Sequence, residues 1–198
     1  MSSSPKGERI EGDRYYTDDA VALRLVRLLD LTGAKRVVEP SVGGGAFVRA
    51  IRAVWPGWIY GIDINHDAPG LDLCPSQIRG ADFLDVGKSG DFLDLPNGAD
   101  WIIGNPPYSH AEAHVRHALT LAPRCAFLLR LAFLESTKRV AFWRDHQPAR
   151  VYVLAQRPSF TGGGTDSAAY GWFVWDADHK GPTVLDVLDE SGPVWGGK

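Results

Sequence analysis

The stretch RVVEPSVGGGAFVRAIRAV, residues 36–54, decides the fold class of this chain of 198 residues. We expect Arg36 to Glu39 to form a short, buried strand that ends at Pro40. The glycines that follow let the backbone adopt positive φ and approach a ligand closely. Residues 45–54 are typical of a helix, whose N-terminus offers free N–H groups to a carboxylate or phosphate. The loop lacks the Gly-Lys-Ser/Thr ending of a nucleotide-triphosphate loop, so phosphate hydrolysis is not expected.

The rest of the chain repeats this alternation of strand and helix. Expected strands cover residues 36–39, 58–64, 78–83, 101–104, 125–131, 151–156 and 170–175, and expected helices cover residues 18–31, 45–54, 109–121 and 135–146. Such alternation predicts an α/β fold with a mainly parallel, seven-stranded sheet that carries helices on both faces. Ligands of such sheets bind beyond the carboxyl ends of the strands, so the residues that follow strands are the candidates for a site.

Composition and charge narrow the class of protein. The chain is 44% hydrophobic and 23% charged, which excludes wholesale disorder, and its net charge of −3 excludes a uniformly basic nucleic-acid coat. Two cysteines without a CxxC pairing fit a reducing cytoplasm. With no signal peptide and no apolar run long enough to span a membrane, a cytoplasmic protein is expected. We expect one domain at residues 13–190, with flexible tails at residues 1–12 and 191–198.

Acidic residues end two of the expected strands. Asp63 ends the second strand, where an acid commonly binds the two hydroxyls of a ribose. Asp82 and Phe83 end the third, where an acid can bind an exocyclic amine and a ring can pack against a base. Together they describe a site for an adenosine that carries an amino-acid tail. Glu39, before the glycine loop, suits a cationic ligand better than a pyrophosphate.

The sequence Asn105-Pro106-Pro107-Tyr108 directly follows the fourth expected strand. Its two prolines fix φ and remove two backbone donors, which leaves carbonyls free to accept hydrogen bonds. The Asn105 side-chain oxygen and the Pro106 carbonyl would form a rigid pair of acceptors, matched to the two hydrogens of one amino group. Tyr108 supplies a face on which a planar group can stack.

These residues resemble the S-adenosylmethionine-dependent amino-group methyltransferases, and most closely the DNA adenine-N6 methyltransferases of bacteria and phages. The resemblance extends over about residues 14–176, and residues 161–175 are similar to small phage-type members. It implies a Rossmann-like class I methyltransferase fold with an antiparallel last strand. Family members that recognise long sites usually carry an extra target-recognition region, and 198 residues leave no room for one, so we expect a single methyltransferase domain without a separate target-recognition domain.

The resemblance also implies the residues of the site. Residues 14–19 are similar to the family's YfTP segment at the methionine end of the cofactor, although Asp18 stands where proline is usual. The implied cofactor-binding residues are Tyr16, Thr17, Glu39, Pro40, Gly43, Gly45, Phe47, Asp63, Ile64, Asp82, Phe83 and Asn105. The implied catalytic residues, Asn105, Pro106, Pro107 and Tyr108, match the family motif without a departure. Phe160 lies where the family often places a second aromatic against the target base.

The implied reaction is methyl transfer from S-adenosylmethionine to the N6 amino group of adenine by direct in-line displacement, without a metal. If Asn105 and the Pro106 carbonyl accept both amino hydrogens, the nitrogen lone pair is aimed at the methyl group. A base inside double-stranded DNA must flip out to reach such a pocket, and Tyr108 and Phe160 would then replace the lost stacking.

Charge is uneven along the chain. Residues 58–100 contain eight acids and two bases, whereas residues 124–157 contain seven bases and two acids. The acidic half would surround a positively charged cofactor, and the basic half, with Arg130, Lys138 and Arg139, would hold phosphates. The histidines at positions 110, 114 and 117 share helical spacing, and we expect them to form a polar face near nucleic acid rather than a metal site.

Other functions stay open at this point. An RNA adenine or guanine amino-methyltransferase and a protein-glutamine N5 methyltransferase share the core motif. A nicotinamide dehydrogenase would explain the glycine loop and Asp63 but not residues 105–108. A catalytically silent DNA-binding subunit is the non-enzyme alternative. Because little of the chain is left for target recognition, we expect a short target sequence, or help from a partner or a second copy, in a bacterial or phage-infected cell.

Overall fold

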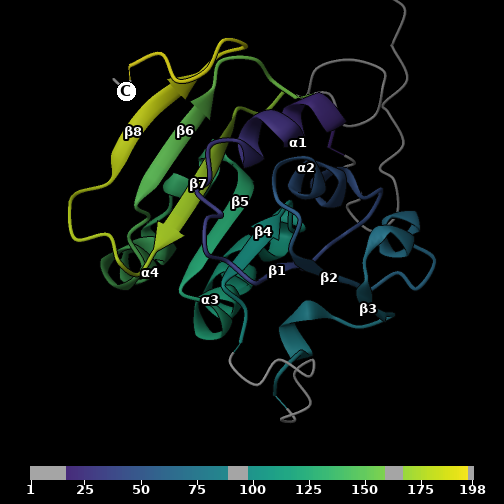
Figure 1. Ribbon diagram of the computed structural model, residues 1–198. Helices are drawn as coiled ribbons and strands as arrows, with labels where there is room; N and C mark the ends of the chain where they lie inside the picture. The colour runs from purple at the N-terminus through teal and green to yellow at the C-terminus, as the bar shows by residue number, and fades with distance from the viewer. Residues whose placement is uncertain (1–16, 89–97, 159–166, 196–198) are drawn as a thin grey trace, which may run out of the picture.

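The computed structural model describes residues 17–88, 98–158 and 167–195. Figure 1 shows one twisted sheet, with α1 and α2 lying on one face and α3 and α4 on the other. The strands are β1 (Arg36–Glu39), β2 (Trp58–Asp63), β3 (Ser76–Arg79), β4 (Trp101–Gly104), β5 (Arg124–Arg130), β6 (Arg150–Leu154), β7 (Tyr170–Asp176) and β8 (Val184–Leu188). Their order in the sheet is β3-β2-β1-β4-β5-β7-β6-β8.

The sheet confirms the expected mainly parallel α/β fold. Of the described strands, β7 alone is antiparallel to its neighbours, β5 and β6. An eighth strand, β8, joins the edge in parallel with β6 and was not predicted. Its buried Asp186 interrupts the apolar pattern, and the carboxylate accepts hydrogen bonds from the amides of Val187 and Trp195. Part of the expected C-terminal tail therefore contacts this edge of the sheet.

The helices are shorter than the expected ones. They are α1 (Asp19–Val26), α2 (Ala46–Val54), α3 (Ala111–Leu121) and α4 (Val140–Asp145). Asp18 caps α1 by accepting from the amides of Ala20 and Val21 at 2.8 and 3.3 Å. Short 3₁₀ turns lie at Pro69–Leu73, Phe83–Asp85, Tyr108–His110, Leu131–Leu134 and Thr137–Arg139. The last two helices therefore each begin with a 3₁₀ turn, where a longer helix was expected.

Adjacent strand residues pack on opposite faces of the sheet. On β1, Val37 faces the core formed with α1 and α2, whereas Val38 faces the core formed with α3. Both side chains are fully buried. Helices thus cover both faces of the sheet, and the carboxyl ends of β2, β1 and β4 lie next to one another.

The third strand was expected at residues 78–83 but lies at Ser76–Arg79. Gly80 ends it with φ at +70°, a conformation that favours glycine. Asp82 and Phe83 therefore do not end the strand but follow it in a turn. The Asp82 side chain accepts from the amide of Leu84 at 2.9 Å and caps the 3₁₀ turn that begins at Phe83.

Candidate active site

A cavity of about 600 Å³ opens beyond the carboxyl ends of β1, β2 and β4, which are neighbours in the sheet. This is where ligands of doubly wound sheets bind. Ten of the residues predicted from the sequence line it: Pro40, Gly43, Asp63, Ile64, Asp82, Phe83, Asn105, Pro106, Pro107 and Tyr108. Five residues that were not predicted from the sequence line it too: Ser41, Asn65, Ala68, Leu84 and Ser109. Four of the five are small or polar, Leu84 is apolar, and none belongs to a motif of its own.

Asp63, the last residue of β2, joins the loops that follow two neighbouring strands. Its Oδ2 accepts from the amide of Gly43 at 2.7 Å, and its Oδ1 accepts from the amide of Asn65 at 2.8 Å. Because a carboxylate oxygen has two lone pairs, each oxygen keeps capacity for a further donor. The carboxylate is thus held in place at the wall of the cavity and remains able to accept from a pair of hydroxyls.

The glycine loop packs closely against the 3₁₀ turn at Pro69–Leu73. A Cβ on Gly70 would lie 2.4 Å from the backbone nitrogen of Gly45. Gly45 itself has φ at +82° and is the N-cap of α2. Glycine is required at both positions, by close approach at one and by conformation at the other.

Glu39, the last residue of β1, lies behind the loop. Its side chain is almost fully buried, and Oε1 accepts from the amide of Ser41 at 3.2 Å, while Oε2 finds no hydrogen-bond donor within the described part of the chain. Burial, and then the charge of Asp63, raise the pKa of Glu39 well above its ordinary value, against the opposing effect of the Ser41 amide. Gly104 makes room for this carboxyl, because a Cβ there would lie 2.2 Å from Oε1.

Asn105 follows β4 and is tied to the residue before the cap of α1. Its Nδ2 donates to the hydroxyl of Thr17 at 3.1 Å. Two prolines follow, and Tyr108 then begins a 3₁₀ turn. The Asn-Pro-Pro-Tyr segment is therefore held at both ends, by Thr17 and by the start of the next helical region.

Tyr108 has a half-buried ring and a buried hydroxyl. Burial, and then Tyr170, raise the pKa of the Tyr108 hydroxyl well above its ordinary value, while hydrogen bonding with Asn105 and the charge of Arg130 lower it. The rings of Tyr108 and Tyr170 lie 5.4 Å apart. The Arg130 guanidinium lies 4.9 Å from the centre of the Tyr108 ring, and its Nε donates to the Tyr170 hydroxyl at 3.3 Å.

A second cavity, of about 250 Å³, adjoins the first, and Tyr108 and Ser109 line both. Arg130, Phe133 and Arg139 form part of its wall. Two of the three basic residues predicted to bind substrate thus lie at this second cavity. Lys138 lines neither cavity and is exposed to solvent.

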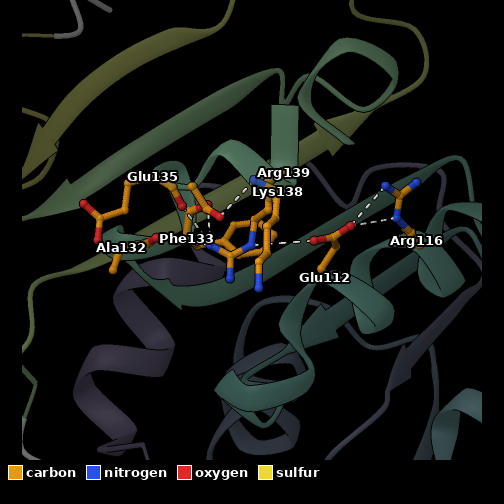
Figure 2. A network of polar contacts seen from close by, with 8 residues as sticks. Glu112, Arg116, Ala132, Phe133, Glu135, Lys138 and Arg139 are labelled. Carbon is orange, nitrogen blue, oxygen red and sulfur yellow. Dashed lines mark hydrogen bonds and ion pairs between the residues drawn. The ribbon is translucent and has the colours of Figure 1, made fainter. Parts of the chain in front are cut away.

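Arg139 is the centre of a polar network that joins the loop after β5 to α3 (Figure 2). Its Nη1 donates to the carbonyls of Ala132, Phe133 and Glu135 at 3.3, 3.2 and 3.0 Å. Its Nε lies 3.6 Å from Glu112, which also accepts from Arg116 at 3.1 Å. The guanidinium therefore organises the wall of the second cavity, whereas the neighbouring Lys138 points its charge to solvent.

The remaining predicted residues lie elsewhere. Thr17, Glu39, Gly45 and Phe47 do not line the first cavity, and Phe47 stacks in the core on Trp172 with ring centres 5.5 Å apart. Tyr16 and Phe160 lie outside the described residues. Within residues 17–88, 98–158 and 167–195, no three His, Cys, Asp or Glu residues gather as a metal site. No described helix is long and apolar enough to cross a membrane.

Solved structures share this fold. A modification subunit of a putative type I restriction enzyme from Vibrio vulnificus YJ016 superposes with a TM-score of 0.67 at 16% identity, covering 90% of this chain and 48% of that one. A putative class I S-adenosylmethionine-dependent methyltransferase from Listeria monocytogenes gives 0.67 at 15% identity, with 93% and 70% covered. A putative RNA methyltransferase from Pyrococcus horikoshii gives 0.59 at 11% identity, with 79% and 81% covered.

These likenesses establish the Rossmann-like fold of class I methyltransferases. No protein-family model and no curated protein matches the sequence. The chain spans about half the length of the restriction-enzyme subunit.

Proposed function

We propose that this chain is an S-adenosylmethionine-dependent methyltransferase that acts on the N6 amino group of adenine in DNA. The observation that carries the proposal is the position of residues 105–108. Asn105, Pro106 and Pro107 line the larger cavity, and Tyr108 lines both cavities. Hydrogen-bond acceptors and an aromatic ring therefore lie where the larger cavity, proposed to hold the cofactor, meets the smaller cavity.

The residues of the larger cavity fit the cofactor. Asp63 keeps acceptor capacity for the ribose hydroxyls, and Asp82 and Phe83 offer an acceptor and a ring to an adenine. The glycine loop lines this cavity through Gly43, and a residue without a side chain lets a ligand approach the backbone closely. When bound, S-adenosylmethionine supplies a methyl group activated by a positively charged sulfur, and the acidic residues around the site favour that charge.

The chain's own residues orient the amino group. The Asn105 amide is held through Nδ2 by Thr17, and the amide oxygen and the Pro106 carbonyl serve as the acceptors for the two amino hydrogens. Such hydrogen bonds strengthen as positive charge develops on the nitrogen, so they stabilise the transition state more than the ground state. Asn105 and Pro106 are therefore the proposed catalytic residues, and the reaction needs no metal.

The target adenine is placed against Tyr108, at the smaller cavity. A base taken out of the duplex loses its stacking, and an aromatic face offsets that cost. Arg130 lies over the Tyr108 ring and bonds Tyr170, so it holds the ring in position and adds positive charge beside the site. Phe160 is proposed as a second aromatic contact.

The basic residues of the loop after β5 have different proposed roles. Arg139 fixes the wall of the smaller cavity through the three carbonyls and Glu112, whereas the exposed Lys138 contacts a DNA phosphate. We further propose that a partner protein or a second copy contributes to target recognition, and that the protein acts in the cytoplasm.

The test is an assay with methyl-labelled S-adenosylmethionine on three substrates: double-stranded DNA, RNA, and a protein that carries an exposed glutamine. Label in the N6 amino group of adenine in DNA, and its loss in Asn105→Ala, support the proposal. Label in RNA alone, or in protein alone, would move the assignment to that substrate. Failure of S-adenosylmethionine to bind in calorimetry would overturn the methyltransferase assignment itself.

A further inference from the structure

His114 lies on α3 in the wall of the larger cavity, although the sequence motifs do not assign it to the cofactor. Its side chain is buried, with 5% of the residue exposed. Its ring packs on Phe83, with ring centres 5.5 Å apart and a tilt of 31°. Phe83 and Asp82 line the same cavity. His114 is therefore next to the residues proposed to hold the adenine of the cofactor.

The helix backbone fixes the tautomer of His114. Its Nδ1 lies 3.1 Å from the carbonyl oxygen of His110, one turn earlier. A carbonyl only accepts, so Nδ1 carries the proton and Nε2 of the neutral ring carries a lone pair. Nε2 makes no hydrogen bond to any residue that the structure describes. Burial lowers the pKa of His114, which favours the neutral ring and this lone pair.

His117, the next histidine on the same helix, differs in this respect. Its Nε2 lies 2.9 Å from the carbonyl of Val86, so this nitrogen is the donor of that contact. Its ring meets Phe83 edge-on at 4.9 Å, from outside the cavity wall. The two histidines thus flank one aromatic ring, but only His114 lies at the cavity.

We propose that His114 is a cofactor-binding residue whose Nε2 accepts a hydrogen bond from the exocyclic amino group of the cofactor's adenine. An amino group has two hydrogens, and Asp82 and His114 provide two acceptors in one cavity. A purine that lacks the amino group has no donor at that position for either acceptor. His114 therefore contributes to selecting adenine over other purines. The inference rests on the proposed function, because it requires an adenosine-based cofactor.

The test compares two ligands by isothermal titration calorimetry: S-adenosylhomocysteine and its 6-deamino analogue, in which hydrogen replaces the amino group. A lost hydrogen bond of about 1.4 kcal/mol corresponds to roughly tenfold in affinity. The preference is the ratio of the affinity for S-adenosylhomocysteine to the affinity for its 6-deamino analogue. In His114→Phe, which keeps an aromatic ring on Phe83, this ratio is expected to fall about tenfold below the wild-type ratio. His117→Phe, the matched control, is expected to keep that preference. An unchanged preference in His114→Phe would overturn the inference.

A second measurement uses the wild-type protein, so it does not depend on the folding of His114→Phe. Protonation turns Nε2 into a donor, so the preference for the amino ligand should fall in acidic solution, below the ordinary histidine pKa of about 6.5. The charged and titratable groups that face His114 are Asp82, from the turn after β3, and His110 and His117, from α3. His114→Gln keeps these groups and an acceptor oxygen, so its preference should not fall over the same range. The same fall in His114→Gln would contradict the proposal.

Two failures can be told apart. If wild-type protein binds neither ligand, the proposed cofactor is wrong, and the inference about His114 is then wrong too. If it binds S-adenosylhomocysteine but His114→Phe shows the full wild-type preference, the proposed function stands and only the role of His114 is wrong.

Discussion

The side-chain amide of Asn105 donates a 3.1 Å hydrogen bond to the hydroxyl of Thr17, 88 residues earlier in the chain. This bond joins the segment before α1 to the turn after β4. Together with the hydrogen bonding between Asn105 and Tyr108, it holds the rotation of the amide about its last torsion, and with it the direction of the amide oxygen. Thr17 is therefore a positioning residue for Asn105, although it does not line the cavity itself.

Replacing Thr17 by valine should slow methyl transfer about tenfold, because the amide loses one of the partners that hold its rotation. The affinity for S-adenosylhomocysteine should change much less than the turnover number. Single-turnover assays and calorimetry measure the two quantities. Thr17→Ser keeps the hydroxyl and should restore most of the rate. Equal losses in the serine and valine variants would contradict the positioning role.

Glu39→Gln should stabilise the protein increasingly as the pH rises. The pKa of Glu39 is raised in the folded state by burial and by Asp63, so the folded protein binds this proton more tightly than the unfolded chain does. The stability from that proton is complete below about pH 4, the ordinary range of a glutamate, and is lost as the pH climbs to the raised value. The amide of the variant has no such dependence. Thermal unfolding from pH 4 to pH 8 measures the difference, and a gap between the proteins that does not vary with pH would exclude this explanation.

Gly104→Ala should destabilise the protein by about 1–3 kcal/mol or more, because the new Cβ would lie 2.2 Å from the Glu39 carboxyl oxygen. Gly181→Ala is the matched control, since its Cβ would meet nothing closer than 3.5 Å. Urea unfolding of both variants measures the free energy of unfolding. A Gly104→Ala protein as stable as Gly181→Ala would show that Glu39 has space to move away.

Lys138→Gln and Arg139→Gln should fail in different ways. Lys138→Gln removes an exposed charge, so DNA affinity should fall. The slope of log affinity against log salt concentration should become shallower by about one. The unfolding temperature should stay the same. Arg139→Gln removes the donor to three carbonyls and the partner of Glu112, so its unfolding temperature should fall by several degrees. Binding titrations at several salt concentrations, with thermal scans, separate the two. Identical behaviour of both variants would refute the division of roles.

Much of the fold could be predicted because apolar runs and glycine turns mark the ends of its strands. β1 and β4 lie at the residues expected, since each is a short run of buried residues followed by proline or asparagine-proline. The third strand was placed too late because two apolar residues, Ile78 and Phe83, bracket a segment in which Gly80 ends the strand through its positive φ. β8 was missed because Asp186 in its middle interrupts the apolar pattern, and its carboxylate accepts from the amide of the next residue, Val187, and from the amide of Trp195, which folds back from beyond the strand.

Site residues could be predicted where they directly follow a strand in the sequence. They could be predicted less well where their position depends on packing between elements. Asp63 and Asn105 follow this rule, and they converge because β2, β1 and β4 are adjacent and parallel. Phe47, next to the glycine loop in sequence, is turned by α2 into the core against Trp172. The placement of His114 depends on Phe83 from another segment, which helical spacing alone does not reveal.

The measurement that tests the central claim most directly is the amount of N6-methyladenine in DNA from cells that have no adenine methylase of their own. The cells express either the wild-type chain or Asn105→Ala, and the nucleosides are quantified by mass spectrometry. The proposed role of Asn105 predicts N6-methyladenine with the wild-type chain and none above background with the variant, at equal protein levels. Equal amounts of N6-methyladenine from both proteins, or none from either, would contradict it.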